Sequence, residues 1–219
     1  MRLKILFLVF VLAHRPLFAQ PLDDIFRTFS ACDATFFKAI KSQEMDLKKI
    51  TPIASQNDIA WFKVPNRKED NGNFLALSGL TIANFPVLSF KDRMSDLDKF
   101  GSYYYWGFVV EGDYKDIVKK IKPLVSQNDR LVEDRADNLK LMVRGEIKTG
   151  NGQWQPTQLK NGVPKKLTVE RVFIIEPDAE TNTVYLSCSL QGTVDADVLK
   201  DLRPDIDTKD YFQNTRTSN

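Results

Sequence analysis

The residues of this chain that could do chemistry are few, and one of them lies in the first segment of the sequence. His14 is the only histidine among 219 residues, and its surroundings have the features of a signal peptide. Without an imidazole in the mature chain, neither a Ser-His-Asp triad, nor a Cys-His pair, nor a histidine zinc site can be built. The sequence also lacks a Gly-x-Ser-x-Gly elbow, a phosphate-binding loop and a dinucleotide glycine fingerprint. We therefore expect a protein without metal ion or cofactor.

Pairs of carboxylates remain as possible catalytic groups. Glycoside hydrolysis needs only two acids held about 5–10 Å apart. The candidate pairs are Asp96 with Asp98, Glu111 with Asp113, and Glu133 with Asp134. A chain with 29 acidic residues offers such pairs by chance, and Asp113 is better explained as the cap of a helix. No named pair is therefore expected to be catalytic.

The two cysteines, Cys32 and Cys188, are predicted to form a disulfide. Cys32 falls on the apolar stripe of a helical segment, and Cys188 falls on the apolar side of an alternating strand. An even number of cysteines in an exported chain favours one bridge. It would connect the first helix to the far end of the chain and add roughly 2–4 kcal/mol of stability. Two separate buried thiols are the alternative.

Four adjacent aromatic residues at 103–106 form the most conspicuous run in the chain. In a strand, Trp106 and its alternate neighbours face the core, whereas Tyr103 and Tyr105 lie on the other face. That second face is either covered by a helix or partly open. If open, the tyrosines predict a contact surface for a partner, because tyrosine is enriched at interfaces. Trp154, in a long polar loop, is a second candidate binding residue, or a plug that holds the loop against the domain.

The elements that position these residues follow from the pattern of apolar side chains. Helical periodicity covers residues 22–43, as one helix or two. A second helix begins after Asp113, has apolar positions between Tyr114 and Val125, and is expected to end at Pro123; a short helix capped by Asp195 or Asp197 ends before Pro204. The expected strands cover residues 59–64, 74–85, 101–111, 139–147, 167–176 and 183–191. Consecutive strands without intervening helices predict an α+β fold: a single domain in which an N-terminal helix and a central amphipathic helix pack on a mainly antiparallel sheet.

The N-terminal segment predicts export. Arg2 and Lys4 precede the apolar run Ile5–Ala13, and Ala19 ends a short stretch suited to signal peptidase. The run is too short for a membrane-spanning helix, which needs about 20 apolar residues. Residues 1–19 are thus expected to be a cleaved signal peptide, residues 20–205 one globular domain, and residues 206–219 a disordered polar tail. Cleavage removes three basic residues from 31 and leaves 28 against 29 acidic ones, a balance that does not favour nucleic acid.

Together these features predict an exported, non-catalytic binding protein, periplasmic or secreted, with no stable membrane anchor after cleavage. The expected partner is another protein of the bacterial envelope, which the chain would neutralise or inhibit as a toxin-immunity protein or hydrolase inhibitor. Two other classes are kept as alternatives: a carboxylate-dependent hydrolase of envelope glycans, and a carrier of a small apolar ligand. No family fingerprint is evident in the sequence.

Overall fold

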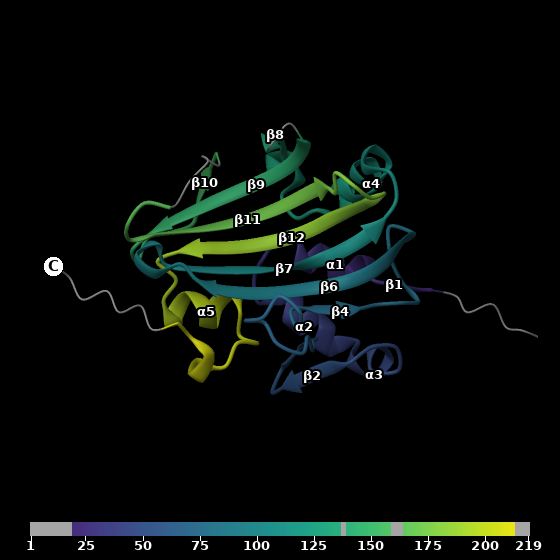
Figure 1. Ribbon diagram of the computed structural model, residues 1–219, viewed down its shortest axis with the longest axis horizontal. Helices are drawn as coiled ribbons and strands as arrows, with labels where there is room; N and C mark the ends of the chain where they lie inside the picture. The colour runs from purple at the N-terminus through teal and green to yellow at the C-terminus, as the bar shows by residue number, and fades with distance from the viewer. Residues whose placement is uncertain (1–18, 137–138, 159–163, 213–219) are drawn as a thin grey trace, which may run out of the picture.

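The computed structural model describes residues 19–136, 139–158 and 164–212. Within this range the chain forms one curled sheet with helices packed on it (Figure 1). The expected signal peptide, except for Ala19, lies outside the described residues, as does the end of the expected tail from residue 213 onward. No helix of the described residues is long and apolar enough to cross a membrane.

Ten strands make up the sheet, in the order β1-β5-β6-β7-β12-β11-β9-β10, with β4 paired to β6 and β8 paired to β9. Their bounds are β1 Gln20–Pro21, β4 Phe74–Ala76, β5 Leu80–Ile82, β6 Phe85–Asp96, β7 Ser102–Glu111, β8 Val132–Ala136, β9 Leu139–Thr149, β10 Gln155–Thr157, β11 Thr168–Pro177 and β12 Thr183–Gly192. The pairings between the described strands are antiparallel except for β1 with β5, which is parallel. The α+β class is confirmed, and the parallel β1 makes the sheet mixed.

The helices and a small hairpin complete the domain. The helices are α1 Asp23–Phe29, α2 Thr35–Ser42, α3 Glu44–Leu47, α4 Tyr114–Ile121 and α5 Ala196–Leu202, with 3-10 turns η1 Asp98–Phe100, η2 Lys122–Leu124, η3 Asn128–Arg130 and η4 Thr208–Asp210. A separate two-stranded sheet pairs β2 (Ile53–Gln56) with β3 (Ile59–Phe62), and α2 lies against β3. Two helices are capped as predicted: the Asp113 carboxylate accepts the amides of the first turn of α4, and the Asp195 carboxylate accepts one from α5.

The core lies between α1, α2 and one face of the sheet, which we call the inner face. On β7 this face carries Tyr104, Trp106, Phe108 and Val110, each at most 1% exposed, as the alternation predicted. Phe29 of α1 packs against Phe108, with ring centroids 5.1 Å apart in an edge-to-face arrangement. In Figure 1, α1 lies behind β6 and β7. The opposite, outer face of β7 carries the alternate side chains.

The predicted disulfide joins Cys32 to Cys188, whose Cα atoms are 5.5 Å apart and whose positions are 156 apart in sequence. It connects the turn after α1 to the centre of β12. Cys32 has a left-handed backbone (φ 56°), and this turn separates α1 from α2, so the periodic segment forms two helices. The bridge therefore holds the helical layer against the sheet at the point where the helix breaks.

The region from residue 74 to residue 96 differs from the strand expected at 74–85. It contains β4, β5 and the long strand β6, because two turns interrupt the pattern. Gly79 has a φ of 73°, and Ala83 and Asn84 both adopt left-handed backbones between β5 and β6. Two left-handed residues match the twist of a tight hairpin. Ala-Asn is not a usual sequence for this turn, which explains why the strand boundary was placed wrongly.

The segment after α5 also packs on the domain. Ile206, the first residue of the expected polar tail, is 3% exposed. Tyr211 and Phe212 are partly buried against the core, and the Phe212 ring lies 6.1 Å from the Tyr104 ring. Residues 206–212 therefore belong to the folded domain.

Candidate functional site: a tyrosine patch on the outer face

Tyr103 and Tyr105 lie side by side on the outer face of the sheet. Their positions are two apart on β7, so both side chains project from the same face, and their rings stack with centroids 6.4 Å apart. Both are half-buried, unlike the fully buried Tyr104 between them. The structure thus brings together two of the three residues expected to bind a partner.

The two tyrosines border a shallow cavity of about 330 Å³ on the outer face. We call its lining the tyrosine patch: Asn73, Lys91, Arg93, Tyr103, Tyr105, Glu176 and Tyr185. These residues come from β6, β7, β11, β12 and the loop before β4, and helices contribute none of them. Of the two alternatives left open for this face, cover by a helix does not apply to the patch.

Strand register explains why residues far apart in sequence meet here. Arg93 of β6 is paired directly with Tyr105 of β7. Tyr185 of β12 is paired with Glu176 of β11, and directly opposite residues share a face. Lys91, on the same side of β6 as Arg93, places its ammonium group 4.5 Å from the centroid of the Tyr185 ring. This is a cation–π contact within the patch.

The patch is electrically uneven. Burial raises the pKa of both Tyr103 and Tyr105, so their hydroxyls stay neutral hydrogen-bonding groups. Burial, together with the charge of Asp178, raises the pKa of Glu176, which favours its uncharged form. Lys91 and Arg93 supply positive charge, and Arg93 has one exposed acidic neighbour, Asp70, at 3.5 Å. The surface is therefore aromatic, rich in hydroxyls and weakly positive.

Trp154 lies elsewhere. Its ring packs over the guanidinium of Arg171, whose central carbon is 4.6 Å from the ring centroid. Arg171 is paired with Leu190, a fully buried residue of the inner face. Trp154 is thus on the inner-face side of the sheet, and the structure does not bring it together with Tyr103 and Tyr105.

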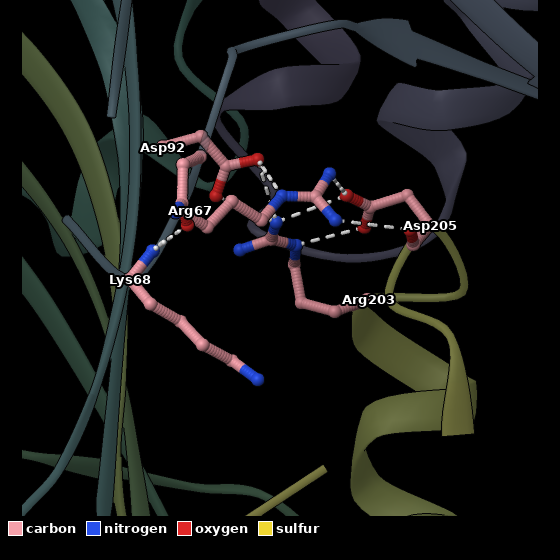
Figure 2. A network of polar contacts seen from close by, with 6 residues as sticks. Arg67, Lys68, Asp92, Arg203 and Asp205 are labelled. Atoms are coloured by element: carbon pink, nitrogen blue, oxygen red, sulfur yellow. Dashed lines mark hydrogen bonds and ion pairs between the residues drawn. The ribbon is translucent and has the colours of Figure 1, made fainter. Parts of the chain in front are cut away.

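Two clusters of buried and partly buried arginine and acidic residues lie on the inner face. The balanced network consists of Arg67, Asp92, Arg203 and Asp205. The arginine-excess cluster consists of Arg130, Arg144, Arg171 and Glu146. Figure 2 shows how the guanidinium groups of the balanced network lie against the two carboxylates.

The balanced network connects three distant parts of the chain. Arg203 Nη2 donates to Asp92 Oδ1 of β6 at 2.9 Å, and Arg203 Nε donates to Asp205 Oδ1 at 2.9 Å. Arg67 bonds the same two carboxylates, with its Nε 2.7 Å from Asp92 Oδ2. Burial alone would raise the pKa of Asp205, but Arg203 and Arg67 hold it below its usual value. The segment after α5 is thereby fixed to β6.

The carboxylate pairs of the sequence analysis lie in ordinary local structures. Asp96 accepts the backbone amide of Asp98 in an exposed turn, at 2.9 Å. Glu133 forms an ion pair with Lys140 at 3.0 Å, and together with Asp134 it lines a cavity at the edge of β9. Within the described residues, no three histidine, cysteine or acidic side chains are grouped so that they could hold a metal ion.

Sequence reasoning missed five members of the tyrosine patch: Asn73, Lys91, Arg93, Glu176 and Tyr185. Alternation along β12 does place Tyr185 on the side opposite Cys188, and this signal was available. The sequence did not indicate which strands are neighbours, because β7 pairs with β12 across more than 70 residues of chain. No family model, no curated protein and no solved structure matches this chain, so its site rests on its own geometry.

Proposed function

We propose that this chain is an exported, non-catalytic binding protein that recognises another protein of the bacterial envelope through the tyrosine patch. The observation that carries the proposal is the pair of stacked, half-buried tyrosines on a sheet face, in a patch to which helices contribute no residue. Tyrosine and arginine dominate the binding energy of protein interfaces. A neutralising or inhibiting role, as in a toxin-immunity protein or a hydrolase inhibitor, would need this kind of surface.

The shape of the patch favours a protein surface over a small ligand. Its cavity of about 330 Å³ is at the low end of the range of small-molecule pockets, about 300–1,000 Å³. Apolar surface continues beyond the cavity, because Phe74 of β4 is paired with Lys91 and is 48% exposed. A partner could cover the cavity and Phe74 in a single contact.

The charge of the patch favours an acidic partner. Lys91 and Arg93 lie beside the tyrosines, and Glu176 is the single carboxylate of the lining. A carboxylate of the partner, placed between these cations and the neutral tyrosine hydroxyls, would receive charge-assisted hydrogen bonds. Such a contact would weaken at high salt, because exposed charges are screened.

The test is affinity capture of partners from envelope extract by wild type, Tyr105→Ala and Lys91→Glu. Lys119→Glu is the matched control, since Lys119 is an exposed lysine of α4 and lies outside the patch. We expect one acidic protein to be held by wild type and control, and its affinity to fall about 30-fold in Tyr105→Ala, as for an interface hot spot.

Thermal unfolding of each variant shows whether the fold is intact. Equal recovery of every captured protein by wild type, Tyr105→Ala and Lys91→Glu would remove the patch from the binding surface. Equal loss in the Lys119→Glu control would also contradict the proposal, because it would show attraction of general charge instead of recognition by the patch.

A further inference from the structure

Three arginine side chains, from η3, β9 and β11, lie near one carboxylate, that of Glu146 on β9. Arg171 of β11 bonds Glu146 Oε2 through Nη2 at 2.6 Å and through Nε at 3.0 Å. Arg130 of η3 bonds Glu146 Oε1 through Nη1 at 3.1 Å. Arg144 lies two residues from Glu146 on the same side of β9. The cluster therefore holds three guanidinium groups and one carboxylate.

Arg144 has a structural task that explains its burial. Its Nη2 donates to the carbonyl of Ser30, the C-cap of α1, at 2.6 Å, and its Nη1 donates to the carbonyl of Ser126. A positive charge is favourable at the C-terminal end of a helix. Arg144 therefore holds the end of α1, but these two bonds do not neutralise its charge, because both acceptors are neutral carbonyls.

The excess of positive charge affects the pKa of Arg144 and that of Glu146. The pKa of Arg144 is lowered to about 10, because burial and the charges of Arg171 and Arg130 together outweigh the opposing charges of Glu146 and Asp33. Burial alone would raise the pKa of Glu146, but Arg171 and Arg130 hold it below its usual value. One more negative charge near the cluster would therefore be stabilised.

A cavity of about 570 Å³ adjoins the cluster at Arg130. It lies where β8 and β10 both border β9, and it is lined by Arg130, Val132, Glu133, Asp134, Val143, Gly145, Pro156, Thr157 and Gln158. Arg130 is the cationic member of this lining, and its Nη2 is buried without a hydrogen-bond partner. The cavity thus combines one cationic donor with two carboxylates, neutral polar groups and apolar side chains.

We propose that this cavity binds the oxyanion group of a small ligand, a carboxylate or a phosphate, through Arg130. A guanidinium group suits both anions. Because Arg130 Nη1 already donates to Glu146 and Gln127, Nη2 is the donor that the ligand would take. The Thr157 hydroxyl, which donates to the Gln158 carbonyl at 3.3 Å, would have to turn to donate to the ligand. Val132, Val143 and Pro156 would contact an apolar part of the ligand. The bound anion would balance part of the positive excess of the cluster.

The acidic lining restricts which anions fit. Glu133 is already paired with Lys140, whereas Asp134 contributes an unbalanced negative charge near the cavity. A second anionic group would be repelled there, which favours a ligand with a single charged group over a polyanion such as nucleic acid. The proposal does not depend on the tyrosine patch, with which the cavity shares no residue.

The test is calorimetric titration of the full chain with inorganic phosphate and, separately, with acetate, at an ionic strength held constant with chloride. Arg130→Gln is the test variant. Arg135→Gln is the matched control, because Arg135 is an exposed arginine of β8 outside the cavity. We expect saturable binding by wild type and control, and affinity about tenfold weaker in Arg130→Gln. Tighter binding of phosphate would identify a phosphate ligand, and tighter binding of acetate a carboxylate ligand.

Amide chemical shifts of the wild-type protein locate the bound anion without any substitution. Shifts that saturate at Gly145 and Thr157 support the site, whereas saturable shifts confined to other parts of the chain would overturn it. Undiminished affinity in a folded Arg130→Gln variant, or no binding of either anion at millimolar concentration, would also overturn it.

Discussion

The balanced network and the arginine-excess cluster are both built from arginine and acidic side chains on the inner face, and they differ in charge and access. In the balanced network, two guanidinium groups meet two carboxylates, and Arg203, Asp92 and Asp205 are almost fully buried. In the other, three guanidinium groups surround one carboxylate, and Arg130 borders a cavity. Buried charge that is balanced holds parts of the chain together, whereas buried charge in excess can still take a ligand.

Both clusters contain an arginine nitrogen without a hydrogen-bond partner, so this feature does not distinguish them. Arg203 Nη1 and Arg130 Nη2 are both buried without a hydrogen-bond partner. Arg203 is enclosed by aromatic rings, with its guanidinium carbon 4.4 Å from the Trp106 ring centroid and 5.6 Å from that of Phe37. The side chain of Arg130 is 27% exposed. Net charge and access, rather than missing bonds, make one cluster a candidate site.

The largest effect is expected from Arg203→Met. The substitution leaves Asp92 and Asp205 buried beside a single remaining cation, Arg67, and breaking a buried ion pair on one side costs about 3–5 kcal/mol. Urea unfolding of wild type and variant measures the change. A loss below about 1 kcal/mol would mean that the network contributes little to stability and that the comparison does not hold.

A smaller effect, with a different response to anions, is expected from Glu146→Gln. Removal of the carboxylate charge leaves Arg171 without an anionic partner and Arg130 with Gln127 alone, and should cost about 1–3 kcal/mol. Because the variant leaves three guanidinium groups without a carboxylate, an anion in the adjoining cavity should bind more tightly, so phosphate should raise the unfolding midpoint of this variant more than that of wild type.

Asp205→Asn provides the matched control for that rescue. It removes a carboxylate from the balanced network, where Asp205 has a fully buried side chain that an added anion would not reach. Chloride at equal ionic strength corrects for general salt effects. Equal recovery of the two variants in phosphate would show that access does not distinguish the clusters.

The smallest effect, with the opposite sign, is expected from Glu176→Gln in the tyrosine patch. Unlike Glu146 and Asp205, Glu176 has a pKa raised by burial, so its contribution to stability is present below about pH 4 and is lost as the pH rises through its folded value. The variant should be more stable than wild type at neutral pH, by less than about 1 kcal/mol, with no difference at acidic pH.

Unfolding curves measured from acidic to neutral pH test this sign. A variant less stable than wild type at neutral pH would show that Glu176 is held as a charged group, as the carboxylates of the two arginine clusters are. Glu176, which has no arginine partner of this kind, would then behave like Glu146 and Asp205, and the expected difference between them would be wrong.

Local patterns were enough to predict several parts of the fold. The alternation of side chains placed Trp106 and Cys188 on the inner face, and the apolar stripe of the first helices placed Cys32 opposite, so the disulfide could be predicted before the structure was known. The caps of α4 and α5 follow from single aspartates beside periodic segments. Each of these features depends on neighbours within about ten residues of chain.

Features that depend on strand pairing could not be predicted in the same way. The strand β8 and the length of β6 have weak local patterns and are stabilised by their partners, β9 and β7. The same holds for the candidate sites. Glu146 attracts an arginine from η3 and one from β11, and nothing in the sequence around it indicates either contact.

The sequence by itself determined which side of each strand and helix is apolar, which cysteines could meet, and that the chain offers no histidine beyond a segment with the features of a signal peptide. Only the tertiary structure decided that Tyr103 and Tyr105 meet Tyr185 and Glu176, that Trp154 lies on the other side of the sheet, and that one arginine cluster is balanced and the other is not. The physical reason is range. Side-chain periodicity is set by the local backbone, whereas charge balance and access depend on segments brought together by the pairing of distant strands.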